Sequence, residues 1–97
     1  MSLHLQSFPT QNPNYELTVL DDELILFSVS HEKAIYLNHT AQIIWKLCDG
    51  DTPVFELIKI LRERYVDEKN IDQQVITALH QMLDDAVIGI SDEPIIQ

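Results

Sequence analysis

Apolar and polar residues alternate through the first third of the chain, and this pattern predicts three short strands. Residues 15–20 and 24–29 are rich in apolar and β-favouring side chains, and Asp21 and Asp22 lie between them at the position of a hairpin turn. A polar link over residues 30–33 separates the second run from a third run at residues 34–37. The pattern therefore predicts an antiparallel meander of three strands.

From Asn38 the apolar residues recur about every 3.6 positions, which is typical of an amphipathic helix. Asn38 is a suitable N-cap, and Gly50 can follow the end of this helix with a positive φ. The buried face of this first helix is predicted to hold Ala41, Ile44, Trp45 and Cys48.

Two further helices follow after short links. The second is expected to start with Thr52 as a side-chain cap and Pro53 at the first helical position. The third is expected to start at Asn70 or Asp72, where Asn70 and Gln73 have the spacing of a capping box. Residues 87–90 form a short closing strand or an extended segment. The predicted buried stripes are Val54, Leu57, Ile58, Leu61 and Tyr65 in the second helix, and Val75, Leu79, Met82 and Ala86 in the third, with Ile76 and Leu83 to one side.

Strands followed by three helices define the expected fold class, an α+β domain of the winged-helix kind. The order is unusual, because the hairpin of most winged helices comes after the recognition helix. We expect a flexible lead-in without a packed element at residues 1–14, a single domain at residues 15–90 and a loosely held tail at residues 91–97.

Composition and charge narrow the classes of function. Sixteen acidic and six basic residues give the 97-residue chain a formal charge of −10, which repels phosphate backbones and anionic membrane surfaces. We therefore expect neither nucleic acid nor membrane as a partner. A solvating role for the acidic residues is the more frequent one, although the charge also favours basic peptides.

The residues that carry chemistry show no catalytic or metal-binding pattern. His4, His31, His39 and His80 have no metal-ligand spacing with one another or with Cys48. A single cysteine makes no disulfide within the chain, which favours the reducing cytoplasm. We expect no enzymatic activity, no catalytic residues, no metal and no cofactor.

The third predicted strand ends the meander, so it is expected to lie at an edge of the sheet. An edge strand exposes unpaired backbone groups, which must be covered or used to accept another strand. Alternation places Ile35 and Leu37 on one face and Ala34 and Tyr36 on the other. Both faces of the sheet carry apolar side chains, so one face is available for a partner or for a second copy of the chain.

The segment from Leu37 to Gly50 resembles the PqqD family. The similar features are a strand that ends in Leu-Asn, a helix with the Ile44-Trp45 pair, and then Leu-Cys-Asp-Gly. The resemblance covers roughly residues 15–90, and Ala86 stands where family members often have Gly. Later positions that match are Thr52, Leu57, Ile58, Leu61 and Tyr65, followed by Val75, Ile76, Leu79, Met82 and Val87.

The resemblance implies a RiPP recognition element, a non-catalytic domain that binds the leader of a ribosomally synthesised precursor peptide and presents it to a modifying enzyme. The implied partners are the precursor peptide and an enzyme such as a radical SAM enzyme or a lasso-peptide peptidase. In this family the leader looks like an added strand beside the third strand, in a groove formed with the third helix. The implied site residues are Lys33, Ala34, Ile35, Tyr36 and Leu37 in the strand, and Gln73, Ile76, His80 and Leu83 in the helix.

Two other functions stay open at the level of sequence. One is a winged-helix DNA-binding regulator, which Asp72, Asp84 and Asp85 on the third helix argue against. The other is a structural or dimerisation module that uses the two-faced sheet as a homodimer interface. Ordinary core packing is an equally good explanation for Ile76 and Leu83.

Overall fold

The structure, a computed structural model, describes residues 3–30 and 32–93. The parts of the predicted lead-in, polar link and tail that fall on residues 1–2, 31 and 94–97 lie outside the described residues. The predicted meander is confirmed: β2 (Tyr15–Leu20), β3 (Glu23–Ser28) and β4 (Ala34–Leu37) form an antiparallel sheet in the order β2-β3-β4. The hairpin turn places Asp21 at φ 50° and Asp22 at φ 68°, the pattern of a type I′ turn that matches the twist of the two strands.

The three predicted helices are also confirmed, as α1 (His39–Leu47), α2 (Val54–Arg64) and α3 (Ile71–Asp84). Asn38 caps α1 as expected, because its Oδ1 accepts the N–H of Ala41 at 2.8 Å. The two other predicted side-chain caps are wrong. Pro53 is the N-cap of α2 rather than its first residue, and Asn70 precedes α3 without a side-chain cap hydrogen bond. The hydroxyl of Thr52 donates to Asp49 instead.

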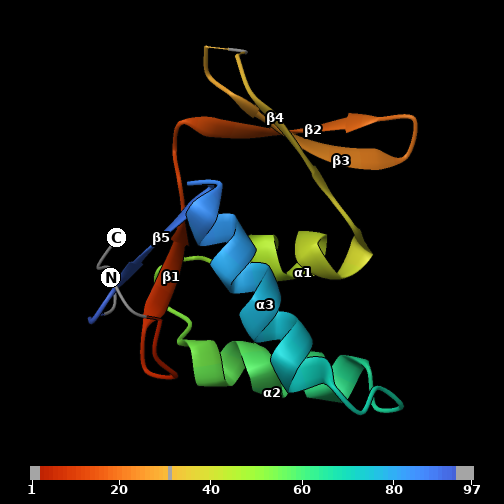
Figure 1. Cartoon of the computed structure of the whole chain (residues 1–97), viewed down its shortest axis with the longest axis vertical. Helices are drawn as coiled ribbons and strands as arrows, with labels where there is room; N and C mark the ends of the chain where they lie inside the picture. Colours follow the sequence, from red (N-terminus) through yellow and green to blue (C-terminus); the bar gives the residue numbers. More distant parts are fainter. Residues whose placement is uncertain (1–2, 31, 94–97) are drawn as a thin grey trace.

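The expectation that no packed element precedes residue 15 is wrong, because β1 (Phe8–Gln11) pairs in antiparallel fashion with β5 (Ile88–Ser91). The other side of β1 is bonded as well: the carbonyl of Pro9 accepts from Gly50, and the N–H of Gln11 donates to Cys48. Proline is compatible with this position in β1 because the bond with Gly50 uses its carbonyl and requires no N–H group. Figure 1 shows this two-stranded ribbon beside the helices.

The amino-terminal segment also caps a helix. The carbonyl oxygens of Leu5 and Ser7 accept the N–H groups of Phe55 and Val54, the first donors of α2. These donors have no partner inside the helix and need one elsewhere. Main-chain atoms thus replace the side-chain cap that the sequence suggested.

The core lies between the inner face of the three-stranded sheet and the helices, with α3 packed across α1 and α2 (Figure 1). Ile25 is buried too, but its side chain lies on the opposite face of the sheet and outside this cluster. None of the described helices is long and apolar enough to cross a membrane. The most deeply buried residues of the core include Leu26, Ile44, Cys48, Leu57, Leu61, Val75 and Leu79.

Candidate functional site

The main feature of the site is the outer edge of β4. Within the part of the chain that the structure describes, β4 pairs with β3 alone. The N–H of Ser28 donates to the carbonyl of Lys33 at 2.9 Å, and the same register pairs Leu26 with Ile35. Since hydrogen-bonded and non-bonded pairs alternate along an antiparallel ladder, the N–H and C=O groups of Ala34 and Tyr36 point away from β3. These two residues are therefore the ones that can bond an added strand.

The two faces of β4 differ as the sequence predicted. Ile35 is half-buried and Leu37 is buried, and both pack into the core. Ala34 is exposed, and Tyr36 leaves 69% of its surface to solvent on the outer face. The strand is thus anchored through one face and open along its edge, which is the arrangement that β-strand addition requires.

A cleft of about 830 Å³ lies where β4 passes into α1, between the first turn of α1 and the flank of α3. The opposite end of β4 is also close to α3, because the Lys33 ammonium donates to the carbonyl of Asp85 at 3.4 Å. Parts of the chain at both ends of β4 thus lie near α3: Asn38 lines the cleft together with α3 residues, and Lys33 reaches the residue that follows α3. The cleft is lined by Asn38, Thr40, Ala41, Asn70, Gln73, Gln74, Thr77, Ala78 and Gln81.

Of the four α3 residues expected in this groove, only Gln73 lines the cleft. Ile76 and Leu83 are half-buried and pack against the core, and His80 is exposed. At about 100° per residue, Ile76 and Leu83 lie on one flank of the buried stripe, whereas Ala78 and Gln81 lie on the other. The sequence analysis singled out only the flank with Ile76 and Leu83, whereas the other flank lines the cleft at the end of β4. The α3 residues that line the cleft but were not predicted from the sequence are polar or small, so the pattern of apolar positions gave no signal for them.

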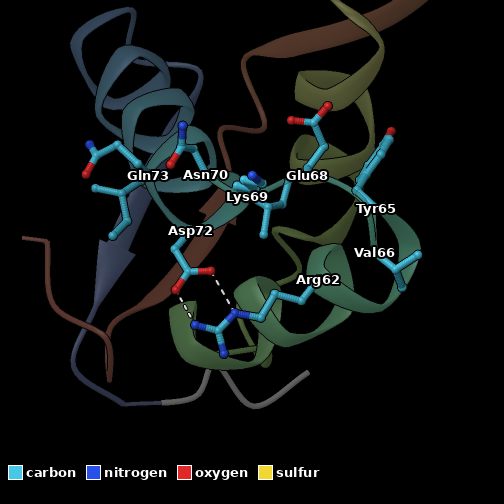
Figure 2. Close-up of a pocket in the computed structure, with 10 residues that line it drawn as sticks. Arg62, Tyr65, Val66, Glu68, Lys69, Asn70, Asp72 and Gln73 are labelled. Carbon is cyan, nitrogen blue, oxygen red and sulfur yellow. Dashed lines mark hydrogen bonds and ion pairs between the residues drawn. The ribbon is translucent and has the colours of Figure 1, made fainter.

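Ile76 and Gln73 line a second cleft of about 540 Å³, at the corner between α2 and α3. Figure 2 shows Arg62 of α2 facing Asp72 of α3 there, in a two-point ion pair between guanidinium and carboxylate. The hydrogen bond from Arg62 lowers the pKa of Asp72. Tyr65 also lines this corner, and its buried hydroxyl finds no hydrogen-bond partner among the described residues. The pair joins α2 to α3 across this corner.

Cys48 is fully buried behind α1, and its Sγ donates to the carbonyl of Ile44 at 3.1 Å. Burial raises the pKa of the thiol to about 12, and the charge of Asp49 acts in the same direction. A thiol in this state is a poor nucleophile. Among the described residues, no group of three or more His, Cys, Asp or Glu side chains is arranged to hold a metal ion.

Comparison with known families agrees with this geometry. The sequence model of PqqD, described as coenzyme PQQ synthesis protein D, matches residues 23–88, from the start of β3 to the start of β5. The chain therefore belongs to the PqqD family. Neither the curated proteins nor the solved structures include a significant match.

Proposed function

We propose that this protein is a non-catalytic recognition element that binds the leader of a ribosomally synthesised precursor peptide as a strand along β4. The observation that carries the proposal is the outward direction of the main-chain groups of Ala34 and Tyr36 at an open edge. The cleft beside α3 gives the leader side chains a surface to contact. Membership of the PqqD family supports this function and gives no support to catalysis.

An added strand at the open edge can supply the free energy of binding that a leader complex requires. A micromolar complex requires about 8 kcal/mol. Hydrogen bonds to Ala34 and Tyr36, together with a few buried side chains, are of sufficient magnitude to supply it. Because backbone hydrogen bonds carry little sequence information, the cleft would determine which leader binds.

The bound leader need not change chemically. Its attached core peptide would be held at a raised effective concentration beside a partner enzyme in the cytoplasm, such as a radical SAM enzyme or a lasso-peptide peptidase. Asp72 and Asp84 on α3, together with Asp85 at its C-cap, argue against the alternative of DNA binding. A homodimer through the outer face of the sheet is a separate possibility that light scattering of the free protein decides.

The direct test is a titration of the labelled leader of a precursor encoded beside this protein, without cofactor or metal. We expect saturable binding in the micromolar range, measured by the fluorescence anisotropy of the labelled leader. Amide exchange of the complex should show new protection at Ala34 and Tyr36. Binding without protection in β4 would move the site elsewhere, and absence of binding by every neighbouring precursor would refute the proposal.

A further inference from the structure

The cleft beside β4 has an unusual lining for a strongly acidic protein. Its walls carry carboxamides, hydroxyls and methyl groups, and none of the residues that line it is charged. Three glutamines of α3, Gln73, Gln74 and Gln81, contribute to this lining. The direction in which their amide groups point decides what the cleft can bind.

Two carboxylates fix that direction. Gln74 Nε2 donates to Glu68 Oε2 at 3.2 Å, and Gln81 Nε2 donates to Asp85 Oδ2 at 3.2 Å. An ionised carboxylate can only accept hydrogen bonds, so the NH₂ end of each amide must face it. Each Oε1 atom is then left to accept from a ligand. Among the described residues, no hydrogen bond reaches either Oε1.

The negative charges around the cleft also favour a ligand that donates hydrogen bonds and carries positive charge. Glu68 and Asp85 lie next to the glutamines at the two ends of this wall, within a chain of net charge −10. Two cations lie near this wall: Lys69 stands between Glu68 and Asn70 in the sequence, and Lys33 donates to the main-chain carbonyl of Asp85, which leaves the carboxylate of Asp85 to Gln81. Among the described residues, neither lysine forms an ion pair with Glu68 or Asp85. Gln74 and Gln81 are seven residues apart, which is about 10 Å along a helix and equals roughly three residues of extended chain.

We propose that this wall of the cleft selects a leader segment with lysine or arginine side chains within a window of three or four residues. The ammonium or guanidinium groups donate to the Oε1 atoms of Gln74 and Gln81 and lie in the field of Glu68 and Asp85. The inference depends on the proposed function, since it names the chemistry of the peptide that β4 binds.

The experiment selects binders from a displayed library of random 12-residue peptides on the immobilised full chain. The selected peptides are then titrated with lysine and arginine replaced one at a time by glutamine. We expect lysine or arginine to be enriched in one short window, and its replacement to weaken binding about tenfold.

Matched protein variants separate local recognition from overall charge. The double variant Glu68→Gln/Asp85→Asn should weaken a basic peptide at least fivefold. Glu56→Gln/Glu63→Gln makes the same change in net charge on α2, no residue of which lines the cleft, and should not weaken it. Peptides that bind along β4 without a basic preference, or an equal effect of the two double variants, would overturn this inference and leave the proposed function standing. A selection that enriches no peptide would overturn both.

Discussion

The backbone N–H of Val54, the first residue of α2, donates to the carbonyl oxygen of Ser7 at 3.0 Å. The next N–H, of Phe55, donates to Leu5 at 2.9 Å. Helix caps normally come from a side chain one to three positions away, but here they come from main-chain atoms nearly fifty residues earlier. The amino-terminal segment is therefore part of the folded domain and holds the start of α2.

Deletion of residues 1–7 should destabilise the domain without abolishing the sheet that carries β4. Two helix caps and the packing of Leu3 against the core are lost, which is worth roughly 2 to 4 kcal/mol in the free energy of unfolding. Urea unfolding monitored by Trp45 fluorescence measures this. Deletion of residues 1–2 is the control, and equal stability of the two truncated chains would show that the caps contribute nothing.

Ala86→Gly should stabilise the domain. Ala86 ends the α3 turn with a φ of 60°, where an L-residue with a Cβ is strained and glycine is not. We expect a gain of about 1 kcal/mol in the free energy of unfolding. Ala78→Gly, the same exchange within α3, is the matched control and should cost about 1 kcal/mol. A loss of stability in both variants would contradict the assigned backbone strain.

Tyr65→Phe should be neutral or stabilising, although it removes a polar group from a half-buried residue. The Tyr65 hydroxyl is buried and finds no partner among the described residues, so it contributes a desolvation cost without a compensating hydrogen bond. We expect a gain of up to about 1 kcal/mol in a thermal or urea unfolding experiment. Tyr36→Phe, at an exposed position, should change stability by less than about 0.5 kcal/mol. A clear loss in Tyr65→Phe would indicate a hydroxyl partner.

Cys48 should make stability depend on alkaline pH. The folded pKa of about 12 lies above the ordinary value of 9.0, so above pH 9 the unfolded chain releases a proton that the folded chain keeps. The contribution is fully present below pH 9 and is lost as the pH rises toward 12, by at most about 1.4 kcal/mol per pH unit.

Urea unfolding at pH 8 and pH 10.5 measures this loss, and Cys48→Ala is the comparison because it lacks the titrating thiol. We expect the parent protein to lose up to roughly 2 kcal/mol more than Cys48→Ala between the two pH values. All other ionisable groups are the same in both proteins, so their effects cancel in the difference. Equal losses would show that the thiol does not titrate differently in the two states.

Strands β2 to β4 and the helices were predictable because each depends on a local pattern: alternation in the strands, and a 3.6-residue period with an Asn38 cap in α1. The pairing of β1 with β5 was not, because Phe8 and Ser91 meet only through the tertiary fold and neither segment has a marked apolar alternation. In the candidate site the same division holds. The edge position of Ala34 and Tyr36 follows from strand order, whereas the rotation of α3 that turns Gln81 rather than Leu83 toward the cleft depends on how the helices pack.

Two neighbouring proline substitutions test the edge of β4 and its assigned role together. The N–H of Ala34 points outward, so Ala34→Pro removes a donor that the isolated fold does not use. The N–H of Ile35 belongs to the ladder with Leu26, so Ile35→Pro breaks the sheet and should cost roughly 2 to 3 kcal/mol in the free energy of unfolding. Ala34→Pro should therefore unfold within about 1 kcal/mol of the parent protein and yet bind the leader about tenfold more weakly, a change of about 1.4 kcal/mol. Urea unfolding and leader titration of both variants measure these effects. If Ala34→Pro binds as tightly as the parent protein, no leader strand pairs with this edge.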